Sequence, residues 1–506
     1  MRTRSIFHRG PASLIVDFLG YYHMSKIRGA LLFVTGGKYI TAVVGLGTTA
    51  LVSRLVTPYE YGIAVLGMST LAVAGSVREL GSAAYVVQVP ELTEARLQGV
   101  FTINLLVTAL LTALIFAAAP ALASIFGEPG LTDFLRISLI GFVTGSVAFP
   151  LHGLLARDLA FNRITAINVA TALVNSAVLL LAAARGFSFL SFAIANVASG
   201  IIGGLLLLWM RPVFGMFRFR LVAWRDVFSF SLYTGGSAIL RRTAEYLSVA
   251  IMGIFLAPGA VGILQRATLL CQFPERTILA GVAEVALPAF SDLARRKSDL
   301  TRSYLGAIER LTAVIWPALL LLMILADPLV RVLLGADWTA TIPLVQIISG
   351  AMLLNFPPGI NYPILMATGA ARRVFHLALL QVTLSLPVVL IAAQYGVRAI
   401  AWSTFAVVGL GVVTSTLAVR KVVPFTLGDL ARSMRGSLGV TMMTVLPVLA
   451  WILPAGGTTG IGPGTLLMLL LAAAGGWVTG VVIFDHPMRS EFGRASQAIR
   501  RRLAHR

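Results

Sequence analysis

Residues 99–124 read GVFTINLLVTALLTALIFAAAPALAS, a stretch without a charged side chain. About 20 apolar residues of α-helix cross a bilayer core, so this stretch is long enough to span a membrane. Backbone amide and carbonyl groups in lipid must find partners within their own segment, which an α-helix provides. Strand-type alternation of apolar and polar residues over ten positions is absent from the chain. The stretch therefore predicts a transmembrane helix and argues against a transmembrane barrel.

The rest of the chain has the same character. Of its 506 residues, 58% are hydrophobic and 12% are charged, and the mean hydropathy is +0.89. A soluble protein carries about 25% charged residues. These values predict an all-α polytopic membrane protein and exclude a cytosolic enzyme, a secreted domain and a disordered scaffold. The fourteen predicted spans are 29–53, 61–87, 99–124, 132–155, 164–184, 188–210, 228–256, 260–290, 307–333, 341–366, 374–394, 397–419, 436–453 and 464–484.

The distribution of basic residues predicts how the chain is oriented. Its 40 Lys and Arg residues against 20 Asp and Glu residues give a net charge of +20. If the N-terminus is cytoplasmic, 28 of the 40 lie in segments on the cytoplasmic side and 5 on the outer side. Retention of basic loops in the cytoplasm explains this bias, so the charge does not call for a nucleic-acid partner. We expect both termini to be cytoplasmic.

Proline and glycine positions indicate an internal duplication. Three motifs recur in order at offsets of 200, 208 and 210 residues: Pro58 with Gly62 and Pro258 with Gly262, Pro120 with Gly127 and Pro328 with Gly335, and Gly186 and Gly396. Spans 1–6 and 7–12 are therefore expected to be two six-helix lobes in the same orientation, as parallel repeats. The predicted organisation is a cytoplasmic arm (1–28), an N-terminal lobe (29–210), a basic cytoplasmic linker (211–227), a C-terminal lobe (228–419), two further helices (420–486) and a basic cytoplasmic tail (487–506).

Motifs for catalysis are missing from the sequence. It has no Walker motif, no dinucleotide-binding glycine motif and no acidic metal cluster, and its six histidines are not at ligand spacing. The single cysteine, Cys271, lies in an apolar run and is expected to be a small core residue. The loops expected on the outer side are too short to form a catalytic face. We therefore expect no enzymatic activity, no cofactor and no metal site.

Ionisable residues inside the predicted spans are the candidates for function. Such residues are costly in lipid and usually face the bundle interior or a watery cavity. They are Lys38, Arg78, Glu79, Arg241, Arg242, Glu245, Arg266, Glu275, Arg276, Glu284, Glu309 and Arg310. A surplus of arginine in a cavity suits phosphate, because the planar guanidinium donates two parallel hydrogen bonds to it. The expected substrate-binding residues are Lys38, Arg78, Arg241, Arg242, Arg266 and Arg276.

A structural interpretation of these charges remains open. They could form interhelical salt bridges, or reach the membrane interface with their charged ends. Arg241 and Glu245 are four residues apart and can pair on one helix face. Arg242 and Arg266 are therefore the better candidates for phosphate, whereas Glu309 and Arg310 fit the structural interpretation better. Lys38 and Arg276 fit both equally well.

Several stretches taken together resemble the Wzx-type polysaccharide flippases, the colanic-acid-exporter-like branch of the multidrug/oligosaccharidyl-lipid/polysaccharide exporter superfamily. The most distinctive is SRLVTPYEYG at residues 53–62. The others are LGSAAYVVQ (80–88), RDLAF (157–161), GILQRA (262–267), LPAFS (287–291), LLGADW (333–338) and ATG (367–369). The resemblance covers about residues 25–420. Because it begins near Met24, residues 1–23 are either an added amphipathic arm or precede the true start.

The resemblance implies an alternating-access flippase that moves a polyprenyl-diphosphate-linked oligosaccharide for exopolysaccharide, O-antigen or capsule synthesis. It implies membrane lipids, a polysaccharide polymerase and a chain-length regulator as partners. Relatives often carry an aspartate where Ser248 and Val249 stand here, so Glu245 or Glu284 would have to supply any cation or proton coupling. A cation-coupled multidrug exporter of the same superfamily is the alternative, although drug export favours acidic cavity residues. A membrane polymerase or ligase is a third reading, weakened by the short outer loops.

Overall fold

The computed structural model describes residues 33–78, 83–221, 224–296, 299–356 and 358–489. Every regular element in these ranges is helical. After a first helix over residues 33–52 come α2 (Pro58–Arg78), α3 (Ala83–Gln88), α4 (Glu94–Ile125), α5 (Gly130–Arg157), α6 (Phe161–Ala184), α7 (Leu190–Met210), α8 (Trp224–Phe255), α9 (Pro258–Arg295), α10 (Leu300–Ile324), α11 (Ala326–Leu333), α12 (Ile342–Met352), α13 (Pro358–Ala367), α14 (Ala371–Gln394), α15 (Val397–Arg420), α16 (Leu427–Ile452) and α17 (Pro463–Ile483). Two short 3-10 helices are η2 (Phe214–Phe217) and η3 (Ala336–Thr341).

Ten of the described helices are long and apolar enough to cross a membrane. They confirm the prediction of an all-helical, multi-pass membrane protein. The long helices α8 and α9 are not among the ten, and they carry several of the charged residues expected inside spans. The count of fourteen crossings stays a prediction, and the predicted arm at residues 1–28 lies outside the described residues.

Two predicted spans are interrupted. The stretch 307–333 divides at Leu325 into α10 and α11, and the stretch 341–366 divides after Met352 into α12 and α13. The sequence places two prolines in succession at 357 and 358, next to the second break. Proline lacks an amide donor and disfavours helical geometry in the residue before it, so one continuous helix cannot form here.

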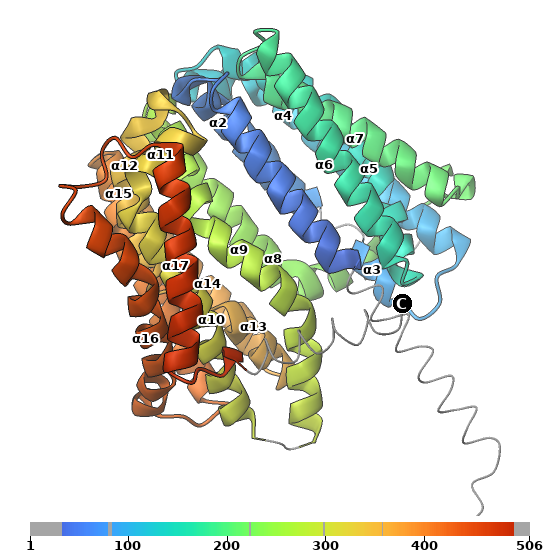
Figure 1. Cartoon of the computed structure of the whole chain (residues 1–506). Helices are drawn as coiled ribbons and strands as arrows, with labels where there is room; N and C mark the ends of the chain where they lie inside the picture. Colours follow the sequence, from blue (N-terminus) through green and yellow to red (C-terminus); the bar gives the residue numbers. More distant parts are fainter. Residues whose placement is uncertain (1–32, 79–82, 222–223, 297–298, 357, 490–506) are drawn as a thin grey trace, which may run out of the picture.

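The helices gather into two groups that Figure 1 shows side by side. In the first group α4, α5, α6 and α7 pack together, with α2 at its edge. In the second group α8 packs on α14, α14 on α15, and α9 on α12 and α13. The terminal pair α16 and α17 packs on α10, at the outer flank of the second group. Helix α2 joins the groups, because it contacts both α8 and α9.

A reciprocal glycine contact brings α2 and α9 together where both helices begin. A Cβ atom added to Gly62 would lie 1.8 Å from the carbonyl oxygen of Pro258, and one added to Gly262 would lie 2.1 Å from that of Pro58. Only glycine permits an approach this close. We call this junction, defined by Pro58, Gly62, Pro258 and Gly262, the closed end. The contact pairs the residues that the predicted duplication relates, while the duplication itself stays a prediction.

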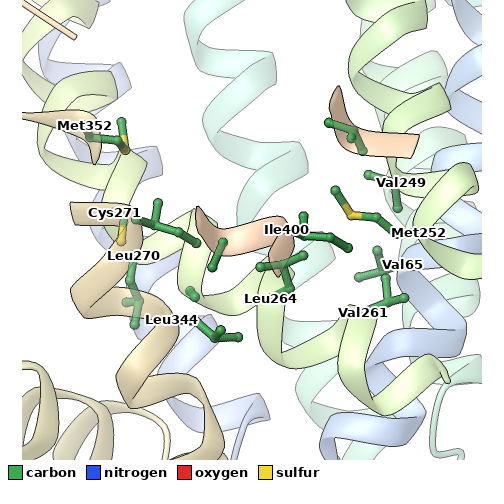
Figure 2. Packing of buried hydrophobic residues seen from close by; sticks show 14 of the residues in the cluster. Val65, Val249, Met252, Val261, Leu264, Leu270, Cys271, Leu344, Met352 and Ile400 are labelled. Atoms are coloured by element: carbon green, nitrogen blue, oxygen red, sulfur yellow. The ribbon is translucent and has the colours of Figure 1, made fainter. Parts of the chain in front are cut away.

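The buried core continues from this junction into the second group. In Figure 2, Val65 of α2 lies near Val249, Met252 and Val261, which come from α8 and α9. Further along α9, Cys271 is fully buried, with its Sγ atom 3.2 Å from the Ser349 hydroxyl of α12. Cys271 is therefore a core residue, as expected.

Candidate functional site: a cationic cavity between the first helix and α9

Two of the predicted substrate-binding residues line one cavity. Lys38 comes from the first helix and Arg276 from α9, more than two hundred residues later in the chain. The cavity has a volume of about 370 Å³, and Tyr39, Thr41 and Phe273 also line it. Ligand pockets usually measure about 300–1,000 Å³. The fold therefore brings two cationic side chains from separate helix groups to one ligand-sized space.

The depth of these two cations follows from the helix rise. Arg276 is 18 residues beyond Pro258, and Lys38 is 15 residues before Ser53 at the closed end. At 1.5 Å per residue these distances are about 27 Å and 22 Å along the helix axes. A bilayer hydrocarbon core is about 30 Å thick. Lys38 and Arg276 thus lie in the half of the membrane opposite the closed end.

Arg266 lies elsewhere, buried at the closed end with a relative exposure of 3%. Its guanidinium carbon is 3.8 Å from the centre of the Tyr61 ring and 5.3 Å from that of Trp338. The Trp338 indole donates a hydrogen bond of 2.7 Å to the backbone carbonyl of Ser53. Arg266 is therefore enclosed between aromatic rings of α2 and η3, away from the cavity that Lys38 and Arg276 line.

Arg78 is held within the first helix group. It donates a hydrogen bond of 2.7 Å to the carbonyl oxygen of Phe142, and its guanidinium lies 4.4 Å from the centre of the Phe142 ring. Phe149 flanks it at 5.4 Å. These contacts are interactions with α5 and tie the end of α2 to that helix.

Arg241 and Glu245 line a groove of about 240 Å³ inside the second group, between α8, α14 and α15. Ser248, Gln381 and Ser385 contribute further polar side chains to this groove. Arg242 is exposed and is not among the residues that line it. The predicted cations therefore fall into separate places, and Lys38 and Arg276 line one cavity together. The side chain of Glu284 lies outside the described residues.

Sequence reasoning missed one polar pair at the break between α12 and α13. The Asn355 side-chain amide lies 3.1 Å and 3.0 Å from the two carboxylate oxygens of Glu275 and donates to that carboxylate. Discontinuous helices often mark working sites in transporters. Glu275 was visible in the sequence as a charge inside a span, and the two prolines after Asn355 were the signal for the break. Their contact depends on packing and carries no sequence signature.

Across the described ranges, no group of three or more His, Cys, Asp or Glu residues is arranged to hold a metal ion.

Comparison with known proteins relates this chain to one family and to several relatives. The profile of a family described as polysaccharide biosynthesis protein matches residues 51–343. The teichuronic acid biosynthesis protein TuaB of Bacillus subtilis (strain 168) is 24% identical over 329 residues, which cover 65% of this chain and 68% of TuaB. The lipopolysaccharide biosynthesis protein WzxC of Escherichia coli (strain K12) is 19% identical over 373 residues, covering 71% and 75%. The succinoglycan biosynthesis transport protein ExoT of Rhizobium meliloti (strain 1021) is 23% identical over 340 residues, covering 66% and 68%.

Solved structures share the fold. The lipid II flippase MurJ in an inward closed conformation superposes with a TM-score of 0.70 at 15% identity, over 90% of this chain and 98% of MurJ. An inward-facing multidrug resistance transporter of the MATE family gives a TM-score of 0.54, also at 15% identity, over 78% of this chain and 94% of its own. The resemblance to polysaccharide flippases drawn from the sequence is confirmed by these matches taken together.

Proposed function

Because the chain belongs to the polysaccharide biosynthesis protein family, we propose that it is a flippase for a polyprenyl-diphosphate-linked oligosaccharide. It moves this substrate from the inner to the outer leaflet of the bacterial inner membrane by alternating access. The observation that carries the proposal is the cavity that Lys38 and Arg276 line together. The product serves exopolysaccharide, O-antigen or capsule synthesis, with a polymerase and a chain-length regulator acting next.

The chemistry of the cavity suits a diphosphate. A lipid diphosphate is a compact anion, and Lys38 and Arg276 bring two positive charges to one cavity in the half of the membrane opposite the closed end. Arginine donates two parallel hydrogen bonds to phosphate oxygens, and lysine adds a concentrated positive charge. Leu269 and Phe273 line the same cavity and supply apolar surface beside the cations. The polyprenyl tail can then remain in the bilayer while the headgroup is held in the protein.

The charges of the loops support the side of the membrane that we propose for the cationic cavity. The predicted cytoplasmic side carries most of the basic residues, and the closed end lies opposite to it. With the closed end facing outward, the cationic cavity is at the cytoplasmic leaflet, where a lipid-linked saccharide is assembled. Two lobes of six helices would then rock about the contact between α2 and α9, with Glu245 or Glu284 coupling the motion to a cation or proton.

Multidrug export by a cation-coupled mechanism is the second candidate, favoured by the structural likeness to MATE transporters. The groove that holds Glu245 also contains Arg241, whose charge opposes a cationic drug or coupling ion there. The cavity between the first helix and α9 is lined by two cationic side chains, Lys38 and Arg276. Both features favour an anionic headgroup over a cationic drug.

The test is complementation of a bacterial strain that lacks its own polysaccharide flippase but assembles the lipid-linked saccharide. The double variant Lys38→Gln, Arg276→Gln keeps hydrogen-bonding capacity but removes both charges, so we expect export to fall at least about tenfold, given about 1.5–3 kcal/mol per charged hydrogen bond. Arg163→Gln, an exposed arginine on α6 outside this cavity, is the matched control. Unchanged export by the double variant, at equal protein level in the membrane, would contradict the proposal.

A further inference from the structure

A second space lies between the first helix, α6 and α7, and it is lined by neutral polar side chains. Its volume is about 320 Å³. Helix α6 contributes Asn168, Thr171, Asn175 and Ser176, and α7 contributes Ser199. Thr41 of the first helix completes the polar lining. We call these six residues the polar groove.

The polar groove contains two asparagine side chains from one long apolar helix, α6. Asn168 and Asn175 are seven residues apart, so two helical turns of α6 present amides to the same space. The Asn175 side-chain amide donates to the Ser199 hydroxyl at 3.3 Å and to the side-chain amide oxygen Oδ1 of Asn196 at 3.4 Å. In the described part of the chain, the side-chain amide of Asn168 has no hydrogen-bond partner. Because Asn168 is exposed in the groove, its amide is open to a polar ligand or to water there.

The polar groove adjoins the cationic cavity. Thr41 and Gly45 line both spaces. A third cavity of about 490 Å³ connects them, because Lys38, Thr41 and Asn168 all line it. Gly37 permits this arrangement, since a Cβ at that position would lie 2.1 Å from the Thr165 side chain and force the first helix away from α6. A headgroup held at Lys38 can therefore extend directly into the groove.

The direction of this extension matches the geometry of the proposed substrate. From Lys38 to Thr41 and Gly45 the first helix runs toward the closed end, about 4.5 to 10 Å deeper into the membrane. In a polyprenyl-diphosphate saccharide, the first sugar lies on the opposite side of the diphosphate from the lipid tail. If the tail leaves the cationic cavity sideways into the bilayer, the first sugar lies on the side of the diphosphate that faces the protein interior, where the polar groove is.

We propose that the polar groove is a saccharide subsite, in which the amides of Asn168 and Asn175 bind hydroxyl groups of the sugar next to the diphosphate. This inference rests on the proposed function and deepens it. Amides both donate and accept hydrogen bonds, and hydroxyls do the same, so the two groups pair well in a neutral site. A sugar chain without charge requires no counter-ion, in agreement with the six neutral side chains of the groove.

The experiment compares binding of three probes to the purified full chain in detergent. The probes are undecaprenyl diphosphate, undecaprenyl-diphosphate-linked glucose and undecaprenyl-diphosphate-linked galactose. We expect the unaltered chain to bind at least one sugar-linked probe about tenfold more tightly than undecaprenyl diphosphate, the combined effect of two neutral hydrogen bonds. The double variant Asn168→Leu, Asn175→Leu should lose this preference and still bind undecaprenyl diphosphate as the unaltered chain does.

Controls separate this inference from the proposed function. Asn162→Leu, on the same helix but outside the polar groove, should keep the preference for sugar. Lys38→Gln should weaken all three probes alike. Failure of the unaltered chain to bind any probe would overturn the proposed function, whereas equal binding of all three would overturn the subsite alone.

A second variant guards against misfolding. If the leucine pair also loses undecaprenyl diphosphate, the near-isosteric pair Thr171→Val, Ser199→Ala removes two hydroxyls of the same groove with little change in volume. Loss of the sugar preference in this pair supports the subsite. An undiminished preference in both pairs would show that the sugar binds elsewhere.

Discussion

Arg266 and Arg276 lie ten residues apart on α9, yet their surroundings differ completely. Arg266 is buried between the rings of Tyr61 and Trp338, whereas Arg276 is exposed in a cavity. A guanidinium enclosed by aromatic rings contributes packing and cation–π attraction. A guanidinium in an open cavity is available to a ligand. The same residue type on one helix thus has a structural role at one position and a proposed binding role at the other.

A pair of matched substitutions tests this division. Arg266→Gln removes the contacts to Tyr61 and Trp338 and should lower the free energy of unfolding by about 2 kcal/mol, the size of a desolvated cation–π contact. Arg276→Gln, in the exposed cavity, should change it by less than about 0.5 kcal/mol. Thermal unfolding of both variants in detergent gives the comparison. Equal stability of the two would show that the aromatic enclosure of Arg266 contributes little.

The position of each charged residue along its helix could be predicted from the sequence. The face of the helix on which its side chain lies could not. Counting residues from the closed end gives Arg241, Arg266 and Arg276 their positions along α8 and α9. The face of the helix on which each side chain lies depends on which neighbours pack there. Tyr61 and Trp338, which enclose Arg266, are about two hundred residues before it and seventy after it in the chain. Such partners have no local signature, so the sequence did not separate the enclosed arginine from the exposed one.

At the scale of helices, the closed end depends on two glycines. Gly62→Ala places a Cβ atom 1.8 Å from the Pro258 carbonyl oxygen, so α2 and α9 must move apart. Overpacking of this kind costs about 1–3 kcal/mol. We expect spin labels at the exposed positions Leu55 and Tyr395, in a Cys271→Ser background, to show a longer or broader distance distribution.

Gly47→Ala is the control for this measurement. No atom lies within 4 Å of a Cβ added at Gly47, so the distance distribution should not change. Gly262→Ala should reproduce the effect of Gly62→Ala, because its Cβ would lie 2.1 Å from the Pro58 carbonyl oxygen. An unaltered distribution in both closed-end variants would mean that α2 and α9 do not limit the separation of the two groups.

The end of α17 carries a pH-sensitive contact. His486 is buried just beyond α17, 3.3 Å from the Ser437 hydroxyl of α16. Burial lowers the pKa of His486 below its ordinary value of 6.5, and the nearby Arg310 guanidinium lowers it further. Because the folded state binds a proton at His486 less readily than the unfolded state does, the stability contributed here is fully present above about pH 6.5. It is lost progressively as the pH falls and the unfolded state gains a proton.

The unfolding temperature should therefore fall between pH 7.5 and pH 5.5. In His486→Gln, which cannot be protonated, the fall should be smaller. Comparing the two chains isolates the contribution of this one residue from other titrating groups. An identical pH dependence in both would show that protonation of His486 does not affect the docking of α17.

Across the whole molecule, the sequence predicted the class of fold better than the site. Apolar length identified the long helices. The spacing of Pro58, Gly62, Pro258 and Gly262 was interpreted as a duplication, and the contact between these residues was not predicted. A hydropathy count treats α12 and α13 as one span, and only the two prolines at 357 and 358 signalled the break between them. The sequence did not predict that Lys38 and Arg276 share a cavity, since that depends on how the first helix lies against α9.

The orientation of the whole chain is a prediction that the structure makes testable. Ser188 donates a hydrogen bond to the Glu60 carboxylate, and Tyr59 donates one to Glu128, so the loops before α5 and α7 lie at the closed end. Arg211 pairs with Asp158 at 3.1 Å, which places the loops after α5 and α7 at the opposite end. The basic residues concentrate on the side of this second set.

Retention of basic segments in the cytoplasm then assigns the two ends. Reporter domains fused after Arg211 and after His505 should both be cytoplasmic, since fourteen crossings return the chain to the side on which it started. A reporter inserted after Gly186 or Gly457, in loops at the other end, should be periplasmic. A periplasmic signal after Arg211 would reverse the orientation and place the Lys38 and Arg276 cavity at the outer leaflet, where it could only receive substrate already flipped. A periplasmic signal after His505 alone would mean an odd number of crossings, and the appended helices α16 and α17 would be the first place to look for the missing one.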